Sequence, residues 1–534
     1  MTLRTALIAA LAKLPRRVAP ARVERAIPLT MRDGAVLVGD LWQPSPDDGS
    51  SAMIVIRTPY ERTGLDLLAR LFAERGHPVF VQSCRGTFGS AGTFRPFADE
   101  AYDGEDTLAA LTTHPWADRP LALIGASYLG YTAYSLLRAD PERIVGMGMA
   151  VTAADFHSAV LYPRGRFSAE TALMWIGGLL TQELPVRARR HAERGIKRRM
   201  REALLTTPDR ADEVLLGSPY PPYQEWVSHD SSDDPWWERI DRTPQLAQTP
   251  PSVHVAGWFD PFLIGQLADH EALIRQGRST RLVVGSWKHA SPGIVGALVR
   301  ETLRVVDHPA ESRGVSVHDG GTGAWIELQQ WPPTTSALEL FLTRGRRLRD
   351  RPGASLECEW RVDPADPPPP AGGRGLNPAH AGRERQRARE RHPGVFSVTS
   401  GSLGRPVTLA GAAHVRLNVA TSAEAQEWSV RLCDVDRFGI SRNVSDGYLC
   451  VPGSPAGPSE QSVTIELNPM AHTFRAGHRL RLQISGSGYP RHPMPLNASR
   501  SRRVISRRDA PSSIVLPIVP GGWPITGTDT AAVG

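Results

Sequence analysis

The segment Gly125–Gly130, with the sequence GASYLG, constrains the fold of this chain more than any other. It follows directly on the apolar run Leu121–Ile124, which predicts a buried strand, and it leads into residues of helical periodicity. A serine on a sharp turn between a strand and a helix exposes its hydroxyl beyond the sheet. The usual form of this turn has glycine two residues after the serine, but here Leu129 stands there and glycine follows. Ser127 is therefore a candidate nucleophile whose partners must lie elsewhere in the chain.

Short apolar runs alternate with segments of helical periodicity in residues 24–152, and the alternation resumes in residues 243–332. Such alternation predicts a mostly parallel sheet that is covered by helices on both faces. The expected strands are Ala35–Leu41, Met53–Ile56, Pro78–Gln82, Leu121–Ile124, Ile144–Ala150, Ser252–Ala256 and Thr280–Val284. The expected helices are Ala101–Thr113, Tyr128–Arg138, Phe262–Gln276 and Pro292–Val306.

Two further regions differ from this pattern. Residues 153–242 lose the strand signal, and within them residues 168–205 are rich in Ala, Leu, Glu and Arg. This predicts a helical insertion between residues 1–152 and 243–332. Residues 333–534 carry β-prone segments separated by Gly and Pro, which predicts a β-sandwich. Within it, Asp363–Gly375 contains four consecutive prolines and is expected to be a surface loop. The β-prone segments are Ala337–Thr343, Ala413–Ala420, Glu427–Asp434, Ser462–Leu467, Arg479–Ser485 and Ser513–Ile518.

Length and charge limit the classes of function. The 534 residues exceed one typical domain and suffice to bury a core. The formal net charge is +7, and much of the excess lies in the clusters Arg187–Arg201, Arg383–Arg391 and Arg500–Arg508. A nucleic-acid site would interleave such clusters with aromatic residues, and none lies within them. We therefore expect solvated helix and loop faces and no nucleic-acid partner.

The cysteines and the N-terminal segment indicate where in the cell the protein is expected. The chain has four cysteines, Cys84, Cys358, Cys433 and Cys450. They are too few for a disulfide scaffold, so we expect free thiols and a cytoplasmic location, although Cys433 and Cys450 could pair if the protein were exported. Residues 1–23 predict an amphipathic helix docked on the protein, with a weak membrane-surface helix as the alternative, because Lys13 interrupts the apolar core of a signal peptide. No stretch is long and apolar enough for stable membrane insertion.

A serine hydroxyl is a poor nucleophile at neutral pH and needs a base to take its proton. On a sheet of this kind, the acid and the histidine follow later strands, in the order serine, acid, histidine. Asp260 follows the expected strand Ser252–Ala256, and His289 follows the expected strand Thr280–Val284. A loop aspartate alone is more often a turn residue, and the chain has 16 histidines. Placed in order at three strand ends, however, Ser127, Asp260 and His289 predict a catalytic triad.

An acyl-transfer site also needs two hydrogen-bond donors for the oxyanion of the tetrahedral intermediate. One is normally the backbone N–H after the nucleophile, which here belongs to Tyr128. The other comes from the loop after an early strand, and the hydroxyl of Tyr60 is the candidate in the loop Arg57–Tyr60. The alternative for Tyr60 is a packed aromatic residue with its hydroxyl in water.

Six segments of the chain together carry a resemblance to a known group: Arg57–Tyr60, Arg85–Gly92, Asp99–Asp106, Gly125–Gly130, Gly257–Asp260 and Trp287–His289. With them, the chain resembles the cocaine esterase / X-prolyl dipeptidyl-peptidase family over nearly its whole length. In that family the serine turn reads Gly-x-Ser-Tyr-x-Gly, which accounts for the late Gly130. The resemblance implies an α/β hydrolase core with a mostly parallel sheet and helices on both faces, a helical cap insertion and a C-terminal jelly-roll β-sandwich.

The resemblance also implies roles for single residues. Ser127 corresponds to the nucleophile, Asp260 to the acid and His289 to the base, and Tyr60 with the Tyr128 N–H corresponds to the oxyanion donors. Aromatic residues in the acyl pocket would be Trp175, Phe262 and, as a looser match, Tyr162, with core packing as the alternative for all three.

The substrate class follows from what surrounds the acid. Members that act on α-amino acid esters hold the substrate ammonium with carboxylates, some of them directly after the acid. Here Pro261 and Phe262 follow it, which favours a neutral acyl group. Two segments depart from the family pattern: Val305–Arg313 lacks the usual basic helix end, and the arginine-rich loop Arg374–His392 matches poorly. This second departure leaves the shape of the pocket open.

We therefore expect a serine hydrolase that cleaves small-molecule carboxylic esters through an acyl-enzyme, with no metal and no organic cofactor. A peptidase or amidase that releases an N-terminal dipeptide, and an acyltransferase, would use the same chemistry. A non-catalytic protein that binds carbohydrate or a partner through the jelly roll is the alternative from another class. A homodimer is compatible with the sequence.

Overall fold

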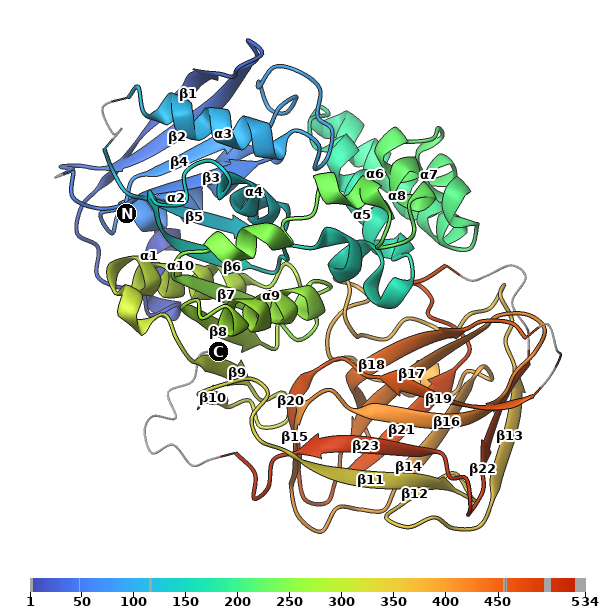
Figure 1. Cartoon of the computed structure of the whole chain (residues 1–534). Coiled ribbons are helices and arrows are strands. Elements are labelled where there is room, and N and C mark those ends of the chain that lie inside the picture. The colour runs from blue at the N-terminus through green and yellow to red at the C-terminus, as the bar shows by residue number, and fades with distance from the viewer. Residues whose placement is uncertain are drawn as a thin grey trace.

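The computed structural model describes residues 3–47, 49–114, 118–454, 457, 459–493 and 501–523. Figure 1 shows an α/β body that contains a helical cap, and beside it an all-β body formed by the C-terminal part of the chain. The two bodies share one continuous apolar core, because Trp258 and Leu263 of the α/β body belong to the same buried cluster as Leu409 and Trp428 of the β body. The fold class expected from the sequence is confirmed.

The α/β body is built on a ten-stranded sheet with the order β1-β2-β4-β3-β5-β6-β7-β8-β9-β10. The strands from β4 to β9 in this order pair in parallel, and antiparallel pairs occur only at the two edges. Their bounds are β1 Ala21–Thr30, β2 Val36–Pro44, β3 Met53–Thr58, β4 Val79–Ser83, β5 Leu121–Ala126, β6 Ile144–Ala150, β7 Ser252–Gly257, β8 Thr280–Gly285, β9 Val315–His318 and β10 Trp325–Leu328. The central strands are buried along their whole length, which is why their apolar runs were recognisable, whereas β1 is largely exposed and was missed together with β9 and β10.

Helices cover both faces of this sheet (Figure 1). One face carries α2 Asp66–Ala73 and α10 Pro292–Asp307. The other carries α3 Glu100–Leu111, α4 Tyr128–Leu136 and α9 Leu263–Arg275. The N-terminal helix α1 Leu3–Leu11 lies over α2 and α10, as predicted for a docked amphipathic helix, with Ile8 and Ala9 packed against their core. Among the described residues, no helix is both long and apolar enough to cross a membrane.

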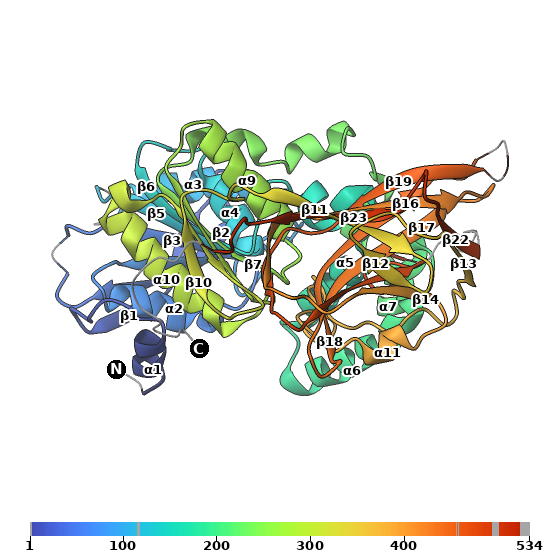
Figure 2. The same cartoon turned by 90° about the horizontal axis from the view of Figure 1, so that it is seen from below.

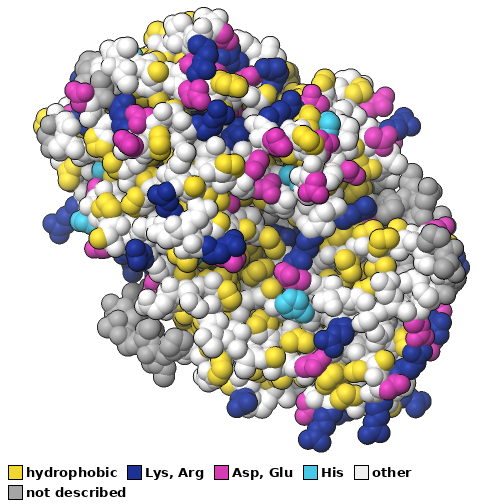
Figure 3. Space-filling view, in the orientation of Figure 1, with side chains coloured by type: hydrophobic (Ala, Val, Ile, Leu, Met, Phe, Trp, Pro, Cys, Tyr) yellow, Lys and Arg dark blue, Asp and Glu magenta, His cyan; other side chains and the backbone are white. Residues whose placement is uncertain are grey.

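The segment between β6 and β7 forms the cap. Its helices are α5 Ala169–Thr181, α6 Val186–Leu204, α7 Pro208–Leu216 and α8 Pro221–Ser228. The basic cluster Arg187–Arg201 lies on α6, whose side chains are mostly exposed until Ala203, as expected for a solvated face. On the face seen in Figure 3, basic and acidic side chains are interspersed over the surface.

The C-terminal body is a sandwich of mostly antiparallel strands, seen from below in Figure 2. Its strands are β11 Ser336–Thr343, β12 Arg347–Arg349, β13 Leu356–Arg361, β14 Val395–Ser400, β15 Val407–Gly411, β16 His414–Ala420, β17 Gln426–Val435, β18 Ser441–Val451, β19 Glu460–Glu466, β20 Met470–Phe474, β21 Arg479–Ser485, β22 Ser501–Ser506 and β23 Ser513–Ile518. One short helix, α11 Arg387–Glu390, interrupts them.

Two sequence expectations in this body need correction. The proline-rich segment Asp363–Gly375 is not a surface loop throughout, because its end from Gly372 onward is buried. There, Arg374 and Gly375 donate to carbonyl oxygens of the α/β body. Two of the arginines expected on solvated faces, Arg389 and Arg502, are buried. The Arg389 guanidinium donates to the Pro369 carbonyl in the loop after β13, and the Arg502 guanidinium donates to the Glu427 carbonyl in β17. The four cysteines are free, as expected.

Acid should destabilise this fold through His254, in β7. Its side chain is fully buried, and neither ring nitrogen has a hydrogen-bond partner among the described residues. Burial and then the neighbouring His270 lower the pKa of His254 to about 3. In the unfolded chain the pKa of a histidine is near 6.5, so the contribution of neutral His254 to the free energy of unfolding is fully present above pH 6.5. It is lost, by about 1.4 kcal/mol per pH unit, as the pH falls toward 3. Urea titrations at pH 7, 6 and 5 should show a smaller decline in His254→Leu than in the wild type, and parallel declines would contradict this assignment.

Candidate active site

Ser127 lies on the turn between the end of β5 and the start of α4, as the sequence predicted. Its backbone has φ 58° and ψ −127°, a conformation that residues other than glycine rarely adopt. Hydrogen bonds hold it there: the Ser127 N–H donates to the Ala150 carbonyl at 3.0 Å, and the Thr152 hydroxyl donates to the Ser127 carbonyl at 2.8 Å. Backbone strain of this kind is typical of functional turns, where the surrounding structure enforces it.

The two glycines of the turn allow the helix to lie close to the strand. A Cβ atom on Gly125 would lie 2.1 Å from the Leu129 carbonyl oxygen, and one on Gly130 would lie 2.4 Å from the Thr152 side chain. Both distances are far below van der Waals contact, so only glycine fits at either position. Gly130 is therefore required because α4 lies directly against Thr152, just after the end of the neighbouring strand β6.

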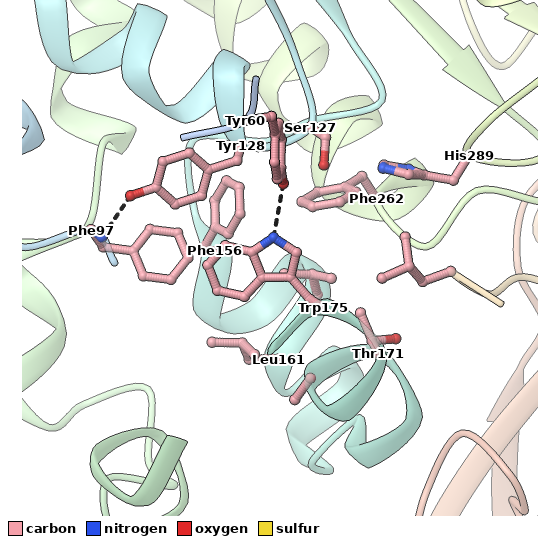
Figure 4. A pocket seen from close by; sticks show the side chains of 13 residues that line it. Tyr60, Phe97, Ser127, Tyr128, Phe156, Leu161, Thr171, Trp175, Phe262 and His289 are labelled. Carbon is pink, nitrogen blue, oxygen red and sulfur yellow. Dashed lines mark hydrogen bonds between the residues drawn. The ribbon is translucent and has the colours of Figure 1, made fainter. Parts of the chain in front are cut away.

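Asp260 and His289 meet at the ends of adjacent strands. Asp260 follows β7 and is fully buried, and His289 follows β8. The His289 Nδ1 lies 2.6 Å from Asp260 Oδ2, while Asp260 Oδ1 accepts the Phe262 N–H at 2.8 Å. A carboxylate on Nδ1 selects the imidazole tautomer that leaves Nε2 free to accept a proton. Figure 4 shows the His289 ring pointing from its loop toward Ser127.

The Tyr60 hydroxyl lies beside Ser127 and is fixed by the cap. Its oxygen accepts a hydrogen bond from the Trp175 indole Nε1 at 2.8 Å (Figure 4). Because the indole can only donate, the Tyr60 proton stays available for a second acceptor in the cavity. Burial raises the pKa of Tyr60 to about 12, despite the opposing effect of the Trp175 hydrogen bond. Tyr60 therefore remains a neutral donor over the whole physiological range.

Tyr128 contributes its backbone to the cavity and its side chain to the layer behind it. It is the first residue of α4, and the first N–H groups of a helix have no partner within the helix. Its hydroxyl donates to Glu100 Oε1 at 3.0 Å and accepts the Phe97 N–H at 2.8 Å. Glu100 in turn pairs with the buried guanidinium of Arg57 at 2.9 Å. This buried network fixes the helix start.

These groups face one cavity of about 290 Å³ between the sheet and the cap. It is lined mostly by apolar and aromatic side chains, and none of its lining residues is a carboxylate, lysine or arginine. The Trp175 ring stacks on Tyr128 with centroids 5.5 Å apart, and Phe262 stacks on His289 at 5.6 Å. The lining residues are Tyr60, Phe97, Ser127, Tyr128, Phe156, Val160, Leu161, Thr171, Ala172, Trp175, Phe262, His289 and Leu376.

One predicted pocket residue lies elsewhere. Tyr162 does not line this cavity: its hydroxyl donates to the Trp226 carbonyl at 2.8 Å, and its ring stacks on His157 inside the cap core. The aromatic side chain of Tyr162 correctly indicated a buried position. Hydrophobic periodicity, however, does not predict which side of the cap that side chain faces.

Several lining residues were not predicted. Phe97 and Phe156 follow no recognisable motif, and Leu376 belongs to the arginine-rich loop that matched the family poorly. The only sequence signal for Leu376 was the poor match of its loop to the family pattern. A loop that shapes the pocket is free to differ between relatives with different substrates, so such a mismatch is compatible with a place in the pocket.

The chain is similar to known hydrolases over most of its length. Residues 33–291 match the model of the X-Pro dipeptidyl-peptidase (S15 family), and residues 309–510 match that of the X-Pro dipeptidyl-peptidase C-terminal non-catalytic domain. The cocaine esterase of Rhodococcus sp. (strain MB1 Bresler) is 27% identical over 562 aligned positions, which cover 92% of this chain and 97% of that protein.

Solved structures show the same fold. An α-amino acid ester hydrolase superposes with a TM-score of 0.77 at 20% identity, and an aminopeptidase from a marine sediment Thaumarchaeota archaeon with 0.76 at 20% identity. Each comparison covers 95% of this chain and 98% of the other. The chain thus belongs to the cocaine esterase / X-Pro dipeptidyl-peptidase (S15) family and is a hydrolase that acts on ester or peptide bonds.

Proposed function

We propose that this protein is a serine carboxylic-ester hydrolase that takes a compact, neutral, apolar acyl group. The observation that carries the proposal is the cavity in which Ser127, His289 and Tyr60 lie together, with His289 hydrogen-bonded to the buried Asp260 at 2.6 Å. Nucleophile, base, orienting acid and oxyanion donor are the parts that acyl transfer through an acyl-enzyme requires.

The reaction follows from these positions. His289 Nε2 takes the proton of the Ser127 hydroxyl while its oxygen attacks the ester carbonyl, and the oxyanion receives hydrogen bonds from the Tyr60 hydroxyl and the Tyr128 N–H. The imidazolium, stabilised by Asp260, gives its proton to the leaving alcohol, and the acyl group stays on Ser127. A water molecule, deprotonated by His289, then attacks the acyl-enzyme and releases the acid.

The lining of the cavity determines the acyl group. A volume of about 290 Å³ is at the small end of ligand-binding pockets. Phe156, Trp175 and Phe262 present ring faces and edges to it, which favour a flat apolar acyl group over a charged one. A substrate ammonium would be desolvated there without a carboxylate partner, at a cost of several kcal/mol.

The second candidate is a peptidase that releases an N-terminal dipeptide, because the matched family model describes an X-Pro dipeptidyl-peptidase. Such an enzyme must hold the N-terminal ammonium of its substrate. The absence of any carboxylate among the cavity-lining residues disfavours it. Transfer of the acyl group to another alcohol or an amine would use the same acyl-enzyme and differ only in the acceptor.

A substrate panel tests this assignment. p-Nitrophenyl esters of acetic, benzoic and dodecanoic acid, with Xaa-Pro-p-nitroanilides beside them and with added alcohol or amine in a second series, should show the highest kcat/KM for the small apolar esters. A fluorophosphonate probe should label Ser127, identified by mass spectrometry of the labelled peptide. Faster hydrolysis of the nitroanilides would favour the peptidase, and no labelling of Ser127 would exclude acyl-enzyme chemistry at this site.

Tyr60→Phe should lower kcat for p-nitrophenyl esters by about 10²–10³-fold with little change in KM. The variant keeps the ring but removes the oxyanion donor, and one such donor is worth that factor. Tyr102→Phe is the matched control, because that tyrosine lies exposed on α3. Equal kcat in Tyr60→Phe and Tyr102→Phe would show that Tyr60 is a packing residue.

A further inference from the structure

A second, polar crevice lies where the cap, the loop after β13 and the jelly roll meet, apart from the catalytic cavity. Four guanidinium groups line it: Arg374 in the loop, Arg389 on α11, Arg431 on β17 and Arg491 after β21. Its volume of about 40 Å³ has room for only a few water-sized particles. Nothing in ester hydrolysis explains this concentration of positive charge.

The acidic groups at the crevice do not balance it. Asp446 lies 3.3 Å from Arg431 and 3.6 Å from Arg491, so one carboxylate serves two guanidinium groups. The other lining carboxylate, Glu170, is already held by His380 at 2.5 Å. The lining thus has four positive charges against two negative ones before any charge on its two histidines, His380 and His492, is counted.

Two of the arginines have unused donors. Arg374 and Arg389 are 7% and 4% exposed, and the Nε–H of each has no hydrogen-bond partner among the described residues. Neither side chain makes an ion pair with a carboxylate in the described part of the chain. Arg374 reaches the Pro261 carbonyl at 3.4 Å, and Arg389 reaches the Pro369 carbonyl at 3.3 Å and the Ser485 hydroxyl at 2.9 Å.

Buried like charges with unpaired donors are costly unless a counter-charge satisfies them. Burial, and then the nearest arginine, lower the pKa of both Arg374 and Arg389 to about 9. Both therefore stay protonated at neutral pH, and the excess charge persists. From this geometry we infer that the crevice is a binding site for a small monovalent inorganic anion of chloride size, held by Arg374 and Arg389. A crevice of this size favours a single-atom anion over phosphate or sulfate.

The site is joined to the catalytic cavity through the loop that carries Arg374. The Gly375 N–H donates to the Phe259 carbonyl at 3.3 Å, next to the buried Asp260, and Leu376 lines the catalytic cavity. A bound anion would therefore fix the segment 374–376 against the loop of the catalytic acid. Anion binding itself does not depend on the proposed ester hydrolysis.

Bromide provides the direct test. Crystals of the full chain grown with sodium bromide should show an anomalous peak within hydrogen-bond distance of Arg374 and Arg389. In solution, replacing sodium chloride by sodium gluconate at constant ionic strength should lower the thermal midpoint, and adding chloride back should restore it along a saturable curve. No peak together with equal midpoints in chloride and gluconate would overturn the inference, as would a midpoint that responds only to added carboxylic acids.

Arg389→Gln should raise the dissociation constant for chloride, obtained from the chloride dependence of the thermal midpoint, by about tenfold or more. The loss of one charge-assisted hydrogen bond has an effect of this size. Arg387→Gln is the matched control, because it removes the same charge from the same short helix at an exposed position. The inference fails if both variants keep the wild-type chloride dependence. Should Arg389→Gln not fold, the bromide crystals of the wild type still decide the question.

Discussion

Ser127→Ala is expected to lower the turnover of p-nitrophenyl esters by about a million-fold, to the rate left by substrate binding and the oxyanion donors alone. The hydroxyl of Ser127 is the only group of the cavity that the proposed reaction joins covalently to the acyl group. Alanine keeps the Cβ atom at φ 58° and so carries the same backbone strain as serine, and the free energy of unfolding should change by less than about 1 kcal/mol.

Steady-state assays and urea unfolding of the same preparation check both parts of this expectation. Ser228→Ala, at the end of α8 in the cap, is the control and should keep wild-type turnover. Turnover within tenfold of the wild type in pure Ser127→Ala protein would show that another residue is the nucleophile. Lost turnover with a lowered unfolding midpoint would instead indicate damage to the turn.

Asp260→Asn is expected to lower kcat by about 10⁴-fold. The carboxylate accepts from both His289 Nδ1 and the Phe262 N–H, so its two oxygens are used. An asparagine that keeps its oxygen on the Phe262 N–H presents its amide to Nδ1, and the imidazole then carries its proton on the nitrogen that must accept one from Ser127. The imidazolium would also lose its counter-charge in a buried site.

The chain contains a matched control for this change. In the cap, Asp234 accepts from His229 Nδ1 at 2.7 Å, the same pair of atoms in a half-buried loop away from the cavity. Asp234→Asn should therefore leave kcat within a fewfold of the wild type. If both variants lose activity equally, the effect belongs to the fold and not to the orientation of His289.

The sequence could predict Ser127, Asp260 and His289 as a proposed triad because each carries a local signal. Ser127 follows a buried strand within a glycine-flanked turn, and Asp260 and His289 directly follow strands whose apolar runs are recognisable without a structure. Parallel strands bring their carboxyl ends to one edge, so position in the chain was enough to predict proximity. The same reasoning missed β1, which is largely exposed and lacks such a run.

The pocket could not be predicted in the same way. Trp175 and Tyr162 are both aromatic residues of the cap, yet one donates to Tyr60 in the cavity and the other to the Trp226 carbonyl in the cap core. The side that each faces depends on how the cap docks, which no periodicity records. Leu376 reaches the cavity from more than 85 residues beyond His289, through a loop whose Gly375 N–H donates to the Phe259 carbonyl, next to Asp260.

The sequence by itself determined the architecture of this protein, an α/β sheet followed by a β-sandwich. It also predicted the proposed chemistry, from a strand–serine–helix turn with an acid and a histidine at later strand ends. These features depend on residues close together in the chain, where hydrophobic periodicity and turn chemistry act. Only the tertiary structure decided the shape of the proposed acyl cavity and the unbalanced arginine crevice, because both arise where segments far apart in the chain meet. Whether a side chain is buried, and therefore what an unpaired charge on it costs, depends on how these segments pack together and not on any one of them.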